Sequence, residues 1–200
     1  DGQTHSKNSF TVTGLPAGYT AVPVITGTIK DAGTEDNVIG SYAIKLGDED
    51  VTAQFSNVTT KDGTLTVTKR AVTMTSATDE KAYNGTPLTN HTVTVTGDGF
   101  VTGEGATYDV TGTQTLVGTS DNTFTYELNE GTLAGNYDIE KVEGTLKVTE
   151  NTNAIVITAD DGTWMYDGQT HSKNSFTVTG LPAGYTAVPV ITGTIKDAGT

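Results

Sequence analysis

Residues 1–34 of this chain occur again, letter for letter, as residues 167–200. A repeat at a fixed spacing indicates tandem modules, and it constrains the fold more than any other sequence signal. A weaker repeat lies halfway along this spacing, because the Tyr-Asn-Gly sequence at 83–85 stands 83 residues before the Tyr-Asp-Gly sequence at 166–168. We therefore interpret the chain as modules of about 83 residues that alternate as type A, type B and type A.

The module boundaries follow from this repeat. Residues 1–69 are expected to form a module A that lacks its first strand, residues 70–150 a complete module B, and residues 151–200 the N-terminal part of a second module A. The linkers at 68–71 and 150–153 contain no Gly/Ser-rich or Pro-rich tether. We therefore expect tight junctions and a fairly stiff array.

The identity of the two A copies extends through their loops, which is more than folding demands, since surface loops accept change at little cost. Recent duplication in a repetitive gene explains it, and such genes are selected for the number of modules they encode. This favours a spacer or array role. The alternative is a designed concatemer, against which the diverged module B argues.

Composition narrows the functional classes further. The chain has a net charge of −13 and no cysteine, which excludes disulfides, thiolate metal sites and a cysteine nucleophile. The negative charge disfavours nucleic acid and anionic membranes as partners. No apolar run approaches the roughly 18–20 residues of a transmembrane helix, so we expect no membrane insertion in this segment. A cysteine-free secreted module fits bacterial surface proteins better than animal extracellular ones, and a cytosolic protein would also allow the absence of cysteine.

Apolar residues alternate with threonine along many short segments, as in Phe-Thr-Val-Thr at 10–13. Successive side chains of a strand point to opposite faces, so this pattern predicts antiparallel sheets with one apolar and one solvated face. Gly, Asn and Asp residues separate the segments and predict turns. The sequence therefore predicts an all-β fold of tandem immunoglobulin-like β-sandwich modules. In module B we expect strands at 71–76, 91–96, 106–111, 123–128, 136–140 and 144–149.

The same alternation predicts the core. In module B the apolar positions are Val72, Met74, Val93, Val95, Tyr108, Val110, Phe124, Tyr126, Leu128, Tyr137, Ile139, Leu146 and Val148. In module A they are Phe10, Val12, Tyr42, Ile44, Leu46, Phe55, Leu65 and Val67. We expect both sets to be buried in equivalent places.

Four motifs occur in a fixed order: Tyr-Asn-Gly at 83–85, Thr-Val-Thr-Gly at 94–97, Gly-Asn-Tyr-Asp-Ile at 135–139 and Gly-Thr-Leu-Lys-Val-Thr at 144–149. This order resembles the MBG/YDG-type repeats, which are immunoglobulin-like modules of large bacterial surface adhesins. The resemblance covers essentially the whole chain, although module A departs from it at 54–58. It implies tandem arrangement and display on the bacterial cell surface, and it supplies no catalytic residues.

The aspartate of the Tyr-Asp-Gly tripeptide could be a metal ligand or a catalytic acid. A turn explains it better, because Asp, Asn and Gly all adopt turn conformations. Asn84 replaces the aspartate in module B. A catalytic carboxylate would not tolerate that replacement within one protein.

Other candidate sites each have a structural explanation. A Ca²⁺ site needs six to eight oxygens, and the acidic residues Asp31, Glu35, Asp36, Asp48, Glu49 and Asp50 match no calcium loop, so we favour a solvated loop. Zinc would need three or four converging ligands, whereas His5, His91 and His171 show no ligand spacing. We expect no metal, no cofactor and no enzyme, since no set of acid, base and nucleophile is visible.

Aromatic and lysine side chains leave two questions open. Trp164, with Met165, Tyr166, Tyr19 and Tyr185, could form an exposed platform for host glycans or matrix protein, although we favour core packing or a junction contact. An internal isopeptide bond from Lys30, Lys45 or Lys81 would need an asparagine nearby, and the sequence does not establish that proximity.

We expect the chain to be a structural stalk or spacer of a bacterial cell-surface adhesin, whose partners are the neighbouring modules. A glycan- or matrix-binding adhesive module is one alternative. A second alternative is a filament of strand-exchanging copies. It follows from two absences: the first module A lacks the strand equivalent to 154–166, and the second module A lacks the residues equivalent to 35–69. Unpaired strand edges are templates for pairing with another copy of the chain, which would build a filament. A window on a continuous array is the simpler explanation of these ends.

Overall fold

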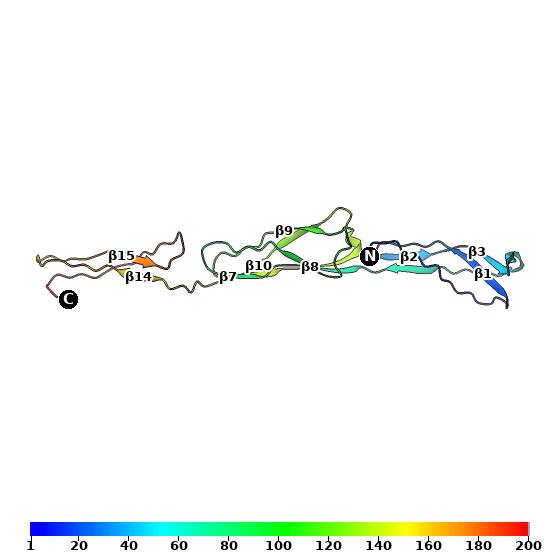
Figure 1. Ribbon diagram of the computed structural model, residues 1–200, viewed down its shortest axis with the longest axis horizontal. Coiled ribbons are helices and arrows are strands. Elements are labelled where there is room, and N and C mark those ends of the chain that lie inside the picture. Colours follow the sequence, from blue (N-terminus) through cyan, green and yellow to red (C-terminus); the bar gives the residue numbers. More distant parts are fainter. Residues whose placement is uncertain (200) are drawn as a thin grey trace. The chain divides into compact units, whose positions relative to one another are not determined.

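The computed structural model describes residues 1–199, and their regular structure is almost entirely β, which confirms the all-β class (Figure 1). Two short 3₁₀ turns, η1 (Thr52–Gln54) and η2 (Ala134–Asn136), interrupt the strands. No helix among these residues has the length and apolar character needed to cross a membrane. The strands are β1 (Tyr19–Ile25), β2 (Gly33–Asn37), β3 (Ile39–Leu46), β4 (Glu49–Asp50), β5 (Gly63–Val67), β6 (Arg70–Ser76), β7 (Asp79–Ala82), β8 (Val93–Gly97), β9 (Ala106–Val110), β10 (Gly118–Asn122), β11 (Phe124–Leu128), β12 (Tyr137–Val142), β13 (Gly144–Thr149), β14 (Val156–Ala159) and β15 (Phe176–Thr179).

The described residues form two compact units. One contains 1–77, 91–111 and 123–144, and the other contains 78–90, 112–122 and the residues from Thr145 on. This division runs through module B and does not follow the repeat. The module boundaries derived from the sequence therefore stay a prediction.

In module B the first two strands lie beside the last two and run in the same direction. β6 pairs in parallel with β12, from Tyr137↔Arg70 to Val142↔Thr75, and β7 pairs in parallel with β13. On its other side β6 pairs with β8 in the antiparallel sense. β13 also pairs with β10, and β9 pairs with β11 in the antiparallel sense. The sequence pattern predicted antiparallel sheets only, because alternation fixes the faces of a strand and not its neighbour.

The strands expected in module B are present, with ends that differ by up to two residues, and β7 and β10 are additional. Seven of the expected core residues are buried, namely Val72, Met74, Val110, Phe124, Tyr137, Leu146 and Val148. The first five form one cluster, and the last two form a second cluster with Leu88. Val95 was predicted wrongly: it is 36% exposed, because β8 is an edge strand and only its Val93 reaches the cluster.

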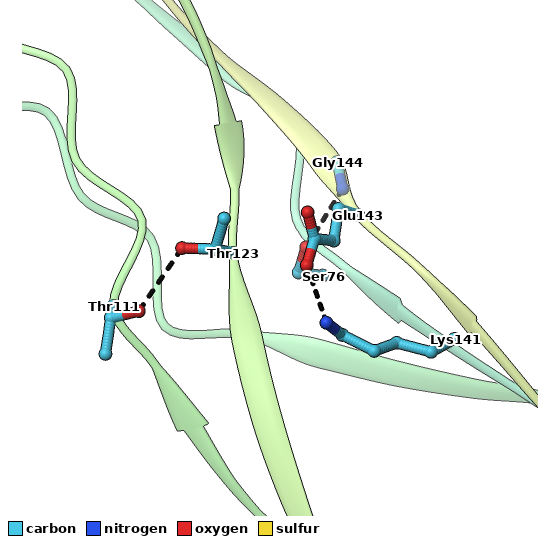
Figure 2. Close-up of polar contacts among 6 residues, drawn as sticks. All are labelled: Ser76, Thr111, Thr123, Lys141, Glu143 and Gly144. Carbon is cyan, nitrogen blue, oxygen red and sulfur yellow. Dashed lines mark hydrogen bonds and ion pairs between the residues drawn. The ribbon is translucent and has the colours of Figure 1, made fainter.

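A tight crossing marks the ends of β6 and β12 (Figure 2). The backbone N–H of Gly144 donates a hydrogen bond of 2.9 Å to the hydroxyl of Ser76. A Cβ atom on Gly144 would lie only 2.4 Å from the carbonyl oxygen of Ser76, so this position requires glycine. Beside it, Lys141 and Glu143 form an ion pair of 2.6 Å, and the hydroxyls of Thr111 and Thr123 lie 3.2 Å apart.

The first module A contains the antiparallel sheet β1-β3-β4 and the antiparallel pair β2-β5. Its predicted core was wrong for four of the eight residues. Ile44 and Leu65 are buried and Phe55 and Val67 are partly buried, whereas the remaining four predicted residues, Phe10, Val12, Tyr42 and Leu46, are between 37% and 45% exposed. In module B the strand β6 covers the corresponding core, and none of residues 1–199 occupies that position in the first module A.

Identical sequences adopt different structures in the two A copies. Residues 10–13 form no strand, whereas the same four residues at Phe176–Thr179 form β15, which pairs with β14. Conversely, Tyr19–Ile25 forms β1 beside β3, and its copy at 185–191 forms no strand. Each segment is a strand only where its partner strand is present, so partner strands decide the local structure here.

Candidate functional site

A groove of about 420 Å³ with a mixed polar and apolar lining opens in the first module A. We call it the A groove. Threonines, Asn57, Lys61 and Asp62 contribute polar groups to its lining. Its apolar lining consists of Val12, Leu15, Ala21, Pro23, Ile39, Tyr42, Ile44, Phe55 and Val58.

Comparison with module B shows what this groove corresponds to. Residues 21–37 align with 106–122, since both contain Thr-Gly-Thr followed by Gly-Thr-x-Asp-Asn. The pairing Ile25↔Ile39 then matches the pairing Val110↔Phe124. A bulge between Val24 and Ile25 shifts the register of the rest of β1. Ile39 therefore stands where module B has Phe124.

In module B the surroundings of that position are filled. Phe124 belongs to the cluster that encloses Val72 and Met74 of β6, which are 1% and 0% exposed. The A groove is therefore the space that the side chains of a β6-like strand occupy in module B.

The second module A presents the opposite situation. Ile155, Val156 and Ile157 are 49%, 52% and 51% exposed. The repeat offset of 83 places Ile155 and Ile157 at the positions of Val72 and Met74. The register supports this offset, because Val156↔Thr179 in β14-β15 corresponds to Thr73↔Thr96 in β6-β8. Among residues 1–199, β14 has a partner only on the edge that faces β15.

A buried asparagine in each module was missed from the sequence. Asn37 and Asn122 are 8% and 0% exposed. Their side-chain amides donate hydrogen bonds of 2.8 Å to the carbonyls of Lys7 and Asn90, which are equivalent positions of the two modules. The repeated Gly-Thr-x-Asp-Asn sequence was the available signal. These asparagines hold a loop to a strand end, which is a structural role.

The Tyr-Asp/Asn-Gly sequences form turns. Gly85 and Gly168 have positive φ angles of 82° and 77°, which favour glycine. The Asp167 carboxylate accepts a hydrogen bond of 2.8 Å from the backbone N–H of Gln169, and Asn84 accepts one of 3.1 Å from Thr86. The hydrogen bond from Gln169, followed by that from His171, lowers the pKa of Asp167.

Different side chains cover this turn in the two module types. In the second module A, Trp164 stacks on His171 with ring centroids 5.2 Å apart. In module B, Lys81 takes the equivalent position, and its ammonium donates to the carbonyl of Thr86 at 2.6 Å and to Asn84 at 3.1 Å. A bond between Lys81 and Asn84 would close a local loop and link no strands. Lys30 lines the same small cavity as Asn136, whose side chain is hydrogen-bonded to Ala32 and Asp31.

The other polar candidates serve local structure. Asp50 accepts hydrogen bonds from the hydroxyl and the backbone of Thr52, which lower its pKa, the hydroxyl contributing most. His91 lies 2.9 Å from the carbonyl of Val110. Residues 1–199 contain no group of three His, Asp or Glu side chains arranged to hold a metal.

Modules A and B contact each other directly within the first compact unit. The side chain of Asn136 accepts a hydrogen bond of 2.7 Å from the backbone N–H of Ala32. The same side chain donates one of 2.9 Å to Asp31. One asparagine of module B thereby binds two consecutive residues of module A, which restricts bending at this junction.

Aromatic side chains near Trp164 are exposed but do not all gather. Trp164 and Tyr166 are 39% and 65% exposed and line a cavity of about 500 Å³. Tyr185, by contrast, contacts the ring of Tyr83, with centroids 5.9 Å apart. In module B the position of Trp164 belongs to β7, which is covered on one edge by β13. No family model, curated protein or solved structure matches this chain.

Proposed function

We propose that this chain is part of a tandem array of immunoglobulin-like β-sandwich modules that forms the stalk of a bacterial cell-surface adhesin. The stalk holds a binding tip away from the cell and transmits force between them. Its partners are the neighbouring modules, and its location is extracellular. The exact repeat, the negative charge and the absence of cysteine support this proposal.

The observation that carries the proposal is the parallel pairing of the first two strands of module B with its last two, β6 with β12 and β7 with β13. β6 begins at Arg70, and its partner β12 ends at Val142. Tension that pulls β6 towards the N-terminus and β12 towards the C-terminus is a shear along their common ladder. All its hydrogen bonds then bear load together, whereas an antiparallel hairpin pulled at its open end loses them one at a time.

Single-molecule force spectroscopy on the 200-residue chain, held at its two ends, tests this function. Glu140→Pro removes a ladder N–H from β12, while Thr107→Pro removes one from β9, which pairs only with β11. We expect Glu140→Pro to lower the unfolding force of module B much more than the control does. Equal losses of force in both variants would contradict a mechanical role for the pairing of β6 with β12.

A binding function has one observation in its favour, the exposure of Trp164 and Tyr166. Aromatic rings with an apolar face and a polar tip are suited to sugar surfaces. Binding of this chain to an array of host glycans and matrix proteins, abolished by Trp164→Ala, would support an adhesive module. Binding that survives this substitution would exclude these rings as the site.

A further inference from the structure

We propose that the Tyr-Asp/Asn-Gly turn is a docking element that joins each module to the module that follows it. We call residues 1–3, 84–86 and 167–169 the exit turns. Their partner is a second turn, formed by residues 101–104 in module B and by residues 182–185 in the second module A, which we call the entry turn. The docking contact deepens the proposed stalk function, on which it rests, because it names the residues that hold neighbouring modules together.

The three exit turns share one conformation. The side chain at the first position accepts a hydrogen bond from the backbone N–H two residues on, at 3.0 Å for Asp1, 3.1 Å for Asn84 and 2.8 Å for Asp167. The glycine that follows has a positive φ in each turn, of 74°, 82° and 77° in the same order. Side chain and glycine together build this turn within the module.

In module B the exit turn lies where the chain leaves the module. The backbone N–H of Tyr83, the residue before the turn, donates a hydrogen bond of 2.8 Å to the carbonyl of Thr149. Thr149 is the last residue of β13, and the linker at 150–153 follows it directly. The exit turn is therefore fixed beside the chain that leads into the next module.

The entry turn has the same structure in both module types. The carbonyl of its first residue accepts a hydrogen bond from the backbone N–H of its fourth residue, at 2.9 Å in 101–104 and at 3.2 Å in 182–185. The third residue of each turn is a glycine with a positive φ, of 88° and 85° respectively.

The loop before the entry turn lies against the chain that enters the module. A Cβ on Gly97 would lie 2.7 Å from the carbonyl oxygen of Ala71, at the end of the linker into module B. In the second module A, a Cβ on Gly180 would overlap the carbonyl oxygen of Ala154 in the same way. Entry turns are therefore held close to the linker, as the exit turn of module B is from the other side.

Exit and entry turns meet at both junctions, and each contact lies within one compact unit. A Cβ on Gly2 would lie 2.8 Å from Cγ1 of Val101. A Cβ on Gly85 would lie 2.7 Å from the ring of Tyr185. Tyr83 adds to this second contact, since its ring centroid lies 5.9 Å from that of Tyr185 and the two hydroxyls are hydrogen-bonded. Two junctions with different residues thus use the same pair of turns.

The chemistry of the docking contact is mainly apolar. The entry turn presents the Val101 side chain at one junction and the Tyr185 ring at the other. Glu104 occupies the fourth position of its turn, as Tyr185 does, but its carboxylate instead accepts a hydrogen bond of 2.6 Å from the Tyr137 hydroxyl. An exit turn, whose glycine has no side chain, therefore fits an entry turn that presents one apolar side chain.

Backbone relaxation measured by NMR on the 200-residue chain tests the contact between Tyr83 and Tyr185. We expect β14 and β15 to have the same rotational correlation time as β7 and β13, because the docked turns hold these strands in one body. Tyr185→Ala removes the ring, so the correlation time of β14 and β15 should become shorter. Tyr19→Ala is the matched control, since Tyr19 is the same residue of the first copy and packs on Phe55 of its own module, with centroids 5.5 Å apart.

Independent tumbling of β14 and β15 in the unmodified chain would overturn the proposal. An unchanged correlation time in Tyr185→Ala, or an equal change in Tyr19→Ala, would also overturn it.

A pair of glycine substitutions separates docking from the strain of the turn itself. Gly85→Ala and Gly168→Ala both place alanine at a positive φ, but apart from chain neighbours no atom of residues 1–199 lies within 4 Å of a Cβ on Gly168. We expect the amide signals of 182–185 to shift in Gly85→Ala and to stay in place in Gly168→Ala. Signals that move equally in both variants, or in neither, would contradict the docking contact.

These measurements are independent of the force test of the stalk function. Independent tumbling of β14 and β15, with module B still resisting force through β6 and β12, would refute the docking contact alone. Equal losses of force in Glu140→Pro and Thr107→Pro would refute the stalk mechanism and leave the tumbling results unaffected.

Discussion

Met74 shows most directly how much module B depends on its first strand. Its side chain is 0% exposed and lies in the larger core cluster. We expect Met74→Ala to lower the free energy of unfolding of module B by about 2–5 kcal/mol, through lost burial and a residual cavity. Val12→Ala in the A groove, where the side chain is 45% exposed, should change the free energy of unfolding of module A by less than about 0.5 kcal/mol. Urea denaturation followed by circular dichroism measures both, and equal effects would contradict the assigned burial.

Gly144 marks the position where two strands approach too closely for any side chain. We expect Gly144→Ala to destabilise module B by about 1–3 kcal/mol, because the new Cβ would overlap the carbonyl oxygens of Ser76 and Ala77. Gly135→Ala is the matched control, since no atom lies within 4 Å of its Cβ position and its φ is not positive. A thermal melt in which both variants lose the same stability would refute the close crossing.

The turn aspartates give stability a dependence on pH at its acidic end. The folded pKa values of Asp50 and Asp167 lie below the ordinary value of 3.8, because their carboxylates accept hydrogen bonds from Thr52 and Gln169, respectively. A lowered folded pKa contributes stability above the unfolded pKa, and this contribution is lost as the pH falls through the folded pKa. We expect Asp50→Asn to reduce the loss of stability between pH 5 and strongly acidic solution. An unchanged acid profile would argue against this contribution.

At the scale of elements, the sequence predicted strand type and missed strand partners. Alternation of apolar residues with threonine correctly marked β6, β9, β11 and β13. It could not reveal that β6 and β12 run parallel, because alternation carries no information about the neighbouring strand. Nor did it mark β10, whose Gly-Thr-Ser-Asp-Asn sequence looks like a turn and forms a strand only through pairing with β13.

The errors in module A have the same origin. Phe10 and Val12 have the pattern of core residues, yet both are 45% exposed because no strand of residues 1–199 covers them. The A groove was therefore not predicted as a feature. A sequence pattern predicts on which face of a strand a residue lies. The residue is buried only if another layer of the structure packs against that face.

At the scale of the whole molecule, net charge keeps copies of the chain apart. Each chain carries a formal charge of −13, so two copies repel one another at low ionic strength. Because salt screens such repulsion beyond about 10 Å at 0.1 M, we expect the second virial coefficient from light scattering to fall as sodium chloride is added. A second virial coefficient that does not change with salt would contradict charge repulsion between copies.

The central claim is that a module A adopts the structure of module B once its first strand is supplied. Fusing a copy of residues 153–166 directly before Asp1 supplies that strand within one chain. Amide hydrogen exchange measured by NMR then reports on residues 10–13, which form no strand at present, while Phe176–Thr179 serves as the internal reference. We predict that residues 10–13 become protected to the level of β15. Unprotected residues 10–13 in a folded fusion would contradict the claim.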